Sequence, residues 1–238
     1  MQSALQLVYP PRCSLCGDLV ESDFGLCGPC WRDTPLISGL CCEKCGASLP
    51  GEDTGHADLC DDCLKIARPW AKGRAALIYK DNGRRLVLAL KHGDRHDIVP
   101  LAANWMAQAA QKILRPNAVI APVPLHWTRL VARRFNQSAL LANAVAESLG
   151  RAVCPDLLQR RRKTPTLKDM TYYQRFSTLD GTIAVNARRR HRIVNRSVLL
   201  VDDVMTSGAT LSAAAQACLN SGAKEIDVLL LARAQKGT

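Results

Sequence analysis

Residues 198–210, VLLVDDVMTSGAT, decide the fold. An apolar run ends in two adjacent aspartates, and a Thr-Ser-Gly turn then leads into residues with helical spacing. A short apolar run bounded by turn residues is typical of a buried strand. In open parallel sheets, ligands bind beyond the carboxyl ends of the strands. The sequence therefore predicts a ligand site around Asp202 and Asp203.

The turn after the aspartates has the chemistry of a phosphate site. The first N–H groups of a helix have no intrahelical partner and lie at the positive end of its dipole. Gly208 allows the backbone to approach an anion, and Thr206, Ser207 and Thr210 add hydroxyl donors. Because carboxylates repel phosphate, we expect the aspartates to face the vicinal hydroxyls of a sugar. This interpretation predicts a ribose 5-phosphate ligand; the alternative is a capped helix behind two incidental acidic residues.

The second half of the chain alternates between strands and helices. Strand patterns cover residues 74–79, 118–124, 197–204 and 225–232, and helical patterns cover 83–93, 97–114, 132–150 and 209–222. This order is typical of a parallel sheet that helices cover on both faces. We therefore predict an α/β fold with a parallel sheet, preceded by a smaller module.

Composition places the chain among globular proteins. Of its 238 residues, 47% are hydrophobic and 22% are charged. No apolar run approaches the roughly 18 residues of a membrane-spanning helix. The start, MQSALQLVYPPRC, lacks the basic and apolar regions of a signal peptide. We expect a cytoplasmic protein without membrane insertion.

Charge is divided unevenly along the chain. Residues 1–70 hold five Lys/Arg and ten Asp/Glu, whereas residues 71–238 hold 27 and 11, which gives net charges of −5 and +16. With the change of pattern near Pro69, this division predicts two domains, at residues 1–69 and 70–238. The basic domain should attract phosphates or nucleic acid; the alternative is a solvated basic surface.

Nine of the 11 cysteines precede residue 64. Eight of them form four C-x2-C pairs: Cys13 and Cys16, Cys27 and Cys30, Cys42 and Cys45, and Cys60 and Cys63. Four thiolates suit a tetrahedral zinc ion, so eight predict two structural zinc ions. Successive tetrads are the simpler arrangement, but the spacing leaves an interleaved arrangement open.

Disulfides and redox-active pairs are the alternatives to zinc. Disulfides need an oxidising compartment, for which the sequence gives no signal, and four pairs at this spacing favour a metal. Cys41 is left over, because the two-residue gap to Cys45 selects Cys42. Cys154 and Cys218 stand in apolar contexts, so we expect them in the core.

The stretch at 198–210 resembles the phosphoribosyl pyrophosphate (PRPP) motif of type I phosphoribosyltransferases. In that family the acidic pair holds the ribose hydroxyls and the following loop holds the 5-phosphate. The resemblance implies that Asp202 and Asp203 bind ribose. It also implies a phosphate loop that consists of Thr206, Ser207, Gly208, Ala209 and Thr210.

The order of motifs along almost the whole chain resembles the ComF family, which is linked to natural transformation and the handling of imported single-stranded DNA. Zinc-ribbon cysteines come first, followed by APVPLH at 121–126, RRFNQSALLA at 133–142 and the PRPP motif. The resemblance implies a double zinc ribbon ahead of a type I phosphoribosyltransferase domain. It implies PRPP with Mg²⁺ as ligands, and single-stranded DNA and competence or DNA-processing proteins as partners.

Two further motifs complete the implied site. The segment that matches the pyrophosphate loop consists of Pro122, Val123, Pro124, Leu125 and His126. Residues 162–175, RKTPTLKDMTYYQR, match a mobile loop that closes over the ligand, with Arg175 best placed for catalysis. The chain departs from the family pattern at Arg134, which stands where a glycine is usual, and at Leu167 and Thr178, which stand where glutamine and asparagine are common.

One function open to such a site is the transfer of phosphoribose from PRPP, with Mg²⁺, to an unidentified acceptor. Pyrophosphate then leaves with negative charge, which basic residues stabilise. Candidates for that role are Lys91, Arg134, Arg162, Lys163 and Arg175. No base-binding loop is recognisable after the last strand, so we expect any hood over the site to come from the zinc module or from residues 73–96.

The alternatives to an enzyme are a nucleic-acid-binding protein and a non-catalytic sensor of PRPP. The basic runs RRRK at 160–163 and RRRHR at 188–192 favour contacts with phosphates. Aromatic residues that could stack on bases lie among basic residues: Trp127, Phe135, Tyr172, Tyr173 and Phe176. We expect the protein to bind PRPP and single-stranded DNA, with catalysis left open.

Overall fold

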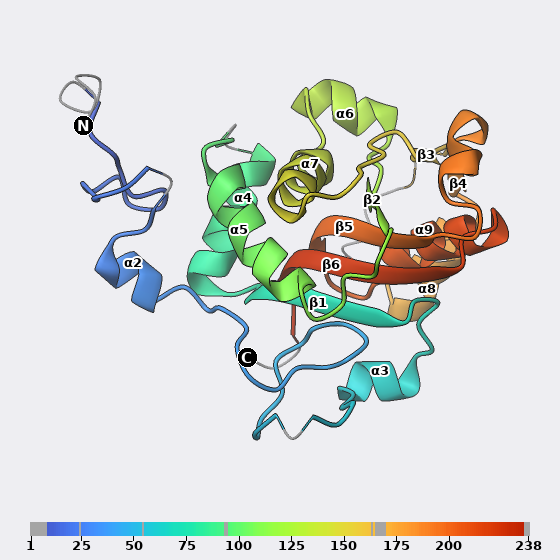
Figure 1. Ribbon diagram of the computed structural model, residues 1–238, viewed down its shortest axis with the longest axis horizontal. Helices are drawn as coiled ribbons and strands as arrows, with labels where there is room; N and C mark the ends of the chain where they lie inside the picture. Colours follow the sequence, from blue (N-terminus) through green and yellow to red (C-terminus); the bar gives the residue numbers. More distant parts are fainter. Residues whose placement is uncertain are drawn as a thin grey trace.

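The computed structural model describes residues 9–23, 25–53, 55–92, 95–162, 164 and 170–235. Its centre is a four-stranded sheet in the order β1-β6-β5-β2 (Figure 1). The strands are β1 (Lys72–Ile78), β2 (Val119–Pro122), β5 (Ser197–Met205) and β6 (Glu225–Arg233). All of their pairings are parallel, with Asp202 of β5 opposite Leu230 of β6. The predicted α/β fold with a parallel sheet is confirmed.

Helices cover both faces of the sheet, because the strands are apolar on both sides. On one face α4 (Asp81–His92), α5 (Ile98–Ala110) and α7 (Gln137–Leu149) pack with residues that include Leu199 and Leu229. On the other face α9 (Ala209–Asn220) packs with residues that include Leu200 and Val228. Beside α9 lie α8 (Tyr172–Leu179) and the antiparallel pair β3 (Leu158–Arg160) and β4 (Ile183–Val185). The 3₁₀ helix η1 (Ala187–Arg192) follows β4.

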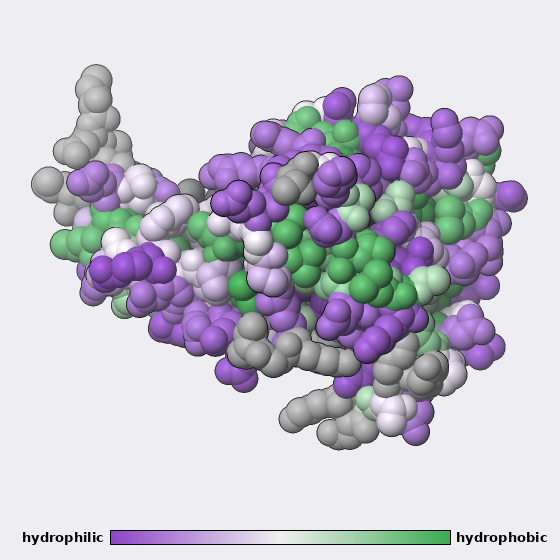
Figure 2. Space-filling model, turned by 90° about the horizontal axis from the view of Figure 1, so that it is seen from below, coloured by the Kyte–Doolittle hydropathy of each residue, from purple (hydrophilic) through white to green (hydrophobic). Residues whose placement is uncertain are grey.

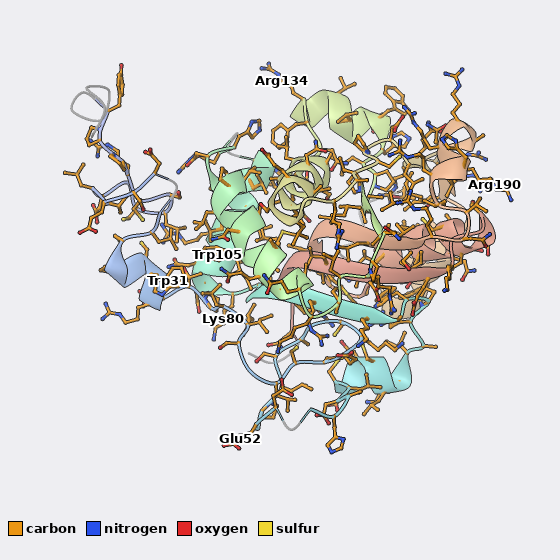
Figure 3. The ribbon with its side chains drawn as sticks, viewed as in Figure 1. Trp31, Glu52, Lys80, Trp105, Arg134 and Arg190 are labelled. Carbon is orange, nitrogen blue, oxygen red and sulfur yellow. The ribbon has the colours of Figure 1, made fainter. Side chains whose placement is uncertain are left out.

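The two cysteine-rich segments pack against different parts of these layers. The first carries the short helix α2 (Gly28–Arg32) and contacts α5, where the rings of Trp31 and Trp105 lie 6.1 Å apart (Figure 3). The second carries α3 (Asp61–Lys65), and Cys42 and Cys45 are fully buried in the core that also contains α9. The second ribbon is therefore continuous with the core of the sheet. The domain boundary between residues 69 and 70 stays a prediction.

The surface on the side of the second ribbon is mixed in character. Hydrophobic residues gather at its middle, and hydrophilic residues surround them (Figure 2). In the described part of the chain, no helix has the length and the apolar character needed to cross a membrane.

The predicted single helix over 132–150 is wrong at its start. The helix α6 (Trp127–Arg133) is followed by its C-cap residue Arg134, whose backbone is left-handed with φ of 66°. The chain then turns, and α7 begins at Gln137 with the Asn136 side chain accepting from Ser138 N. Asparagine is a strong N-cap because its side chain satisfies an N–H group that the helix leaves free.

Other differences concern short elements. The helix predicted over 97–114 ends at Ala110, several residues before Pro116. The strands β3 and β4 and the helices α6 and α8 had no counterpart in the sequence analysis, because segments of three to eight residues carry too few periods to stand out. Part of the predicted mobile loop at 162–175, including Lys163 and Leu167, lies outside the described residues.

We expect Arg134→Gly to stabilise the protein, because glycine adopts the left-handed conformation without the steric cost of a side chain. The gain should be about 0.5–1 kcal/mol after allowing for the extra flexibility of glycine in the unfolded chain. Urea unfolding measures it. The matched control is Gly150→Ala at the left-handed end of α7, which should lose a similar amount. Equal midpoints for Arg134→Gly and the wild type would contradict the prediction.

Candidate functional site

The acidic pair lies near the carboxyl end of β5 and is largely enclosed. Asp203 is only 4% exposed, and the Nζ atom of Lys91, from α4, lies 3.2 Å from its Oδ1 atom. The other carboxylate oxygen of Asp203 is buried and has no hydrogen-bond partner in the described part of the chain. A buried carboxylate is stable only if it is paired. Lys91 therefore balances the charge of Asp203.

Asp202 reaches a different helix. Its Oδ1 atom accepts hydrogen bonds from Ser138 Oγ at 2.8 Å, at the start of α7, and from Asp203 N at 3.0 Å. Burial and then the charge of Asp203 raise the pKa of Asp202 to about 7, against the opposing effects of Ser138 and Lys91. Near neutral pH the Asp202 carboxyl therefore exchanges between its neutral and charged forms.

The predicted phosphate loop joins β5 to α9. Gly208 is left-handed, with φ of 83°, and precedes the first residue of the helix. A Cβ atom on Gly208 would lie 2.6 Å from Met205 Cε and 2.8 Å from Arg68 Nη1, so these side chains would have to shift, and the positive φ itself favours glycine. The start of α9 has a single weak cap, from Ala209 N to Ser207 Oγ at 3.4 Å. The remaining N–H groups of this turn are suited to an anion.

Arg175, Asp202 and the loop come together around one pocket. A small cavity of about 50 Å³ is lined by Arg175, Asp202 and residues 204–211. A larger neighbouring cavity, of about 280 Å³, shares Arg175, Thr206 and Ser207 with it and reaches Asp62 of the second ribbon. The structure thus places Arg175 beside the loop and the acidic pair. Arg134 lies elsewhere, exposed at the end of α6 (Figure 3).

The PVPLH segment follows β2, which is the neighbour of β5, and therefore lies at the same edge of the sheet. Val123 N donates to Val201 O at 2.9 Å, and Asn136 Nδ2 donates to Val123 O at 3.1 Å. The members of this segment are buried, except that Leu125 is half-buried: Pro122, Val123, Pro124, Leu125 and His126. His126 caps α6 by accepting from Thr128 N at 3.3 Å, so this ring nitrogen has a structural partner.

Sequence reasoning missed four residues that shape the site: Asn136, Ser138, Arg68 and Arg233. The first two belong to the quoted motif RRFNQSALLA, in which an asparagine before a helical pattern is a recognisable capping signal. Arg68 and Arg233 hold carbonyl groups of the phosphate loop. No local pattern marks them, because their partners are distant in sequence.

The eight paired cysteines form two successive tetrads: Cys13, Cys16, Cys27 and Cys30, and Cys42, Cys45, Cys60 and Cys63. Within each tetrad the sulfur atoms all lie within 4.8 Å of one another. Four sulfurs bound to zinc at about 2.3 Å are about 3.8 Å apart. The contacts of 3.5 Å between Cys16 and Cys27 and 3.6 Å between Cys45 and Cys60 fit this geometry, and they exceed a disulfide bond length. The tetrads suit two structural zinc ions, and the interleaved alternative is excluded.

The remaining cysteines lie outside the tetrads. Cys154 and Cys218 are buried, as predicted, and burial raises the pKa of each thiol. Cys41 is half-buried, and burial likewise raises its pKa. By contrast, hydrogen bonds from Cys45 and Cys63 lower the pKa of Cys42 to about 3, whereas hydrogen bonds with Cys42 and Cys45 raise that of Cys63, so Cys42 favours the thiolate. Thiolate is the form that binds zinc.

We expect Asp202→Asn to stabilise the protein more at pH 8 than at pH 5. The folded-state pKa of Asp202 is raised, so its favourable contribution is present below about pH 4 and is lost as the pH rises towards 7. Asparagine keeps the Oδ1 acceptor without the charge, and its advantage at pH 8 should be on the order of a few kcal/mol. Thermal unfolding at both pH values measures it.

The control for this prediction is Ser138→Ala, which removes a hydrogen bond that lowers the pKa of Asp202. The carboxyl titration, followed by nuclear magnetic resonance, should move to higher pH in this variant. An equal gain from Asp202→Asn at pH 5 and pH 8 would mean that packing, and not charge burial, is responsible.

Comparison with known proteins places this geometry in a family. A family model described as "Double zinc ribbon domain" matches residues 4–69, and one described as "Phosphoribosyl transferase domain" matches residues 136–238. The solved structure of "the allosteric regulatory enzyme of purine biosynthesis" matches 60% of this chain and 30% of its own, with 18% identity and a TM-score of 0.41.

Two curated relatives match nearly end to end. The chain is 32% identical over 235 residues to the DNA utilization protein YhgH of Salmonella typhi. The aligned region covers 95% of this chain and 99% of the relative. It is 29% identical over 230 residues to Competence protein F of Haemophilus influenzae, and this alignment covers 94% of this chain and 97% of the relative. With its two cysteine tetrads ahead of a phosphoribosyltransferase domain, the chain belongs to the ComF family.

Proposed function

We propose that the protein binds PRPP at the end of β5 and acts on single-stranded DNA in competence or DNA utilization. The observation that carries the PRPP proposal is the combination of a carboxylate pair with an anion-binding turn a few residues later. Each carboxylate already has a protein partner, Ser138 or Lys91, that fixes its orientation. Ligand hydroxyls can therefore meet oriented acceptors, which lowers the entropic cost of binding.

The phosphate group of the ligand has matching donors in this proposal. The hydroxyls of Thr206, Ser207 and Thr210 and the turn N–H groups before α9 bind the 5-phosphate, with the helix dipole in support. Arg175 lines the same pocket and stabilises negative charge on the diphosphate. Pro122 to His126, at the end of the adjacent strand, border the diphosphate from the other side.

The residues at this edge also fit Mg²⁺, which accompanies PRPP in the proposal. Magnesium prefers oxygen ligands and is commonly bound by one or two carboxylates together with phosphates. The buried Asp203 Oδ2 atom has no partner in the described part of the chain, and Asp202 is adjacent. When bound, Mg²⁺ would neutralise charge on the diphosphate. Lys91 and Arg175 are the proposed cationic residues of this chain for the same purpose.

Catalysis of phosphoribosyl transfer is the second candidate function. The observation that favours it is the cavity of about 280 Å³ beside the loop, which offers space for an acceptor next to Arg175. Asp62 of the second ribbon lines this cavity, in keeping with the expectation of a hood from the zinc module. A non-catalytic sensor would use the same pocket without an acceptor, so release of pyrophosphate separates the two.

The double substitution Asp202→Ala with Asp203→Ala tests the ribose contacts. Charge-assisted hydrogen bonds contribute on the order of 1.5–3 kcal/mol each, so PRPP affinity should fall at least about tenfold. Removing two negative charges also eases the approach of any polyanion, which acts in the opposite direction. Calorimetry with PRPP and with inorganic pyrophosphate, which lacks the sugar, separates these effects. Unchanged or tighter PRPP binding by a folded double variant would refute the ribose proposal.

Binding of single-stranded DNA has its own support. The names of the two relatives, DNA utilization protein and Competence protein F, refer to DNA handling, and they concern those proteins. In this chain, exposed arginines stand beside the β3–β4 pair: Arg161 and Arg162 after β3, and Arg188 and Arg190 in η1 after β4. Arg189 differs, because it pairs with Asp156 at 2.8 Å. A strip of positive charge of this kind suits a nucleic-acid backbone.

Charge reversal at Arg161 and Arg162 tests this surface. The variant should bind single-stranded oligonucleotides of every sequence more weakly, and the slope of affinity against salt should flatten by about 0.7 per lost phosphate contact. Fluorescence anisotropy at several salt concentrations measures both. The control matched in charge is Arg32→Glu with Lys80→Glu, two exposed positions of which Lys80 is well separated from Arg190 (Figure 3). An equal loss in both variants would indicate a non-specific effect of net charge and would contradict the assignment.

A further inference from the structure

Two buried arginines hold the phosphate loop from the side of the second ribbon. Arg68 is 9% exposed and donates from Nη1 to Ser207 O at 2.7 Å. Arg233 is 2% exposed and donates from Nη1 to Met205 O at 3.2 Å and to Thr206 O at 3.0 Å. Three consecutive carbonyls of the loop are therefore bound to arginine.

This arrangement determines where the loop N–H groups point. A trans peptide is planar, and its carbonyl and the next N–H point in opposite directions. Carbonyls that are fixed towards the arginines therefore direct the N–H groups of Thr206, Ser207 and Gly208 away from them. A phosphate needs convergent N–H donors of this kind. The arginines thus position the anion-binding surface without touching the ligand themselves.

The same two arginines lie against the second cysteine tetrad. Nη2 of Arg233 lies 3.5 Å from Oδ2 of Asp62, the residue before Cys63. Arg68 lies over the ring of Trp70, 5.5 Å from its centroid, and Trp70 belongs to the core cluster that contains Cys42, Cys45 and Cys63. Arg233 is therefore paired with a residue of the second ribbon, and Arg68 packs on a ring of the core that encloses the second tetrad.

Charge balance explains why the arginines are tolerated in the core. Nε and Nη2 of Arg68 and Nε of Arg233 are buried without a hydrogen-bond partner in the described part of the chain. A buried guanidinium in this situation needs a negative group nearby. One zinc ion with four thiolates has a net charge of about −2, which two arginines neutralise. Metal-bound thiolates are commonly stabilised by such outer-sphere donors.

Among the residues described, no arginine beside the first tetrad donates to the phosphate loop, although Asn82 of α4 donates to Cys30 O at 3.2 Å. Arg12, on the first ribbon, donates to Gly17 O at 3.0 Å within that ribbon and is exposed. Arg95 donates to Ser14 O at 2.9 Å and to Asp97. The two ribbons therefore provide a natural internal comparison, because only the second reaches the phosphate loop.

We propose that the zinc-loaded second ribbon sets the conformation of the phosphate loop through Arg68 and Arg233, whereas the zinc of the first ribbon has no influence on it. Arg68 and Arg233 are positioning residues in this proposal. Its consequence for ligand affinity rests on the function proposed above for the loop, but the coupling between metal and loop does not.

The test compares full-length Arg68→Gln and Arg233→Gln with the wild type, in the absence of ligand. Hydrogen–deuterium exchange at residues 205–210 should be faster in both variants, because the carbonyl of Ser207 or of Thr206 loses its arginine donor. Zinc release to a chromogenic chelator, assigned to a tetrad by alkylation of the freed cysteines, should be about 10- to 100-fold faster from the second tetrad. Release from the first tetrad should be unchanged. The matched control, Arg12→Gln, should leave loop exchange at the wild-type rate.

The proposal is overturned if loop exchange or release from the second tetrad matches the wild type in folded variants. If the variants do not fold, the wild type provides the test. Coupling between binding equilibria is reciprocal, so PRPP with Mg²⁺ should raise the zinc affinity of the second tetrad, measured by competition with a chelator, and not that of the first. Equal effects on both tetrads, or none while calorimetry shows binding, would overturn it. Absence of PRPP binding to the wild type would refute the proposed function instead, and the ligand-free exchange data would still decide the coupling.

Discussion

Burial of negative charge at the end of β5 is the constraint on which the surroundings of the site depend. A carboxylate that leaves water must be paired or protonated, and an unpaired one costs several kcal/mol. The chain uses both solutions on adjacent residues. Asp203 is paired with Lys91, whereas Asp202 accepts from Ser138 and has a pKa raised to about 7. The last turn of α4 and the first turn of α7 must therefore meet at this strand end.

On the other side of the phosphate loop, buried positive charges must likewise be balanced by negative groups. There the buried charges are two guanidinium groups, and the groups that balance them are thiolates and Asp62 of the second ribbon. The loop lies between an acidic pair and a pair of arginines. Its carbonyls point towards the arginines, and its N–H groups point away from them. Gly208 is favoured here because its φ of 83° lies in the left-handed region, and a side chain would also displace Met205 and Arg68.

The two ribbons consequently differ in their relation to the rest of the protein. The first contacts α5 through Trp31 and Trp105 (Figure 3), and its Leu15 and Leu26 are partly buried against the core on that face of the sheet. The second shares its core with α9 and with alternate residues of β5 and β6. A division of the chain by charge, net −5 before residue 71 and net +16 after it, separates acidic from basic sequence. It does not separate two independent hydrophobic cores.

The sequence by itself determined the features that local spacing encodes. Apolar runs and helical periods gave the four strands of the sheet and its main helices, and the C-x2-C pairs gave the eight sulfur atoms of the tetrads. Only the tertiary structure decided which distant side chains meet: Ser138 with Asp202, 64 positions apart, and Arg68 with Ser207, 139 positions apart. It also decided that the chain turns at Arg134, where the local pattern continues as a helix. Periodicity reports which face of an element is buried, whereas the partner of a buried charge depends on how separate elements pack together.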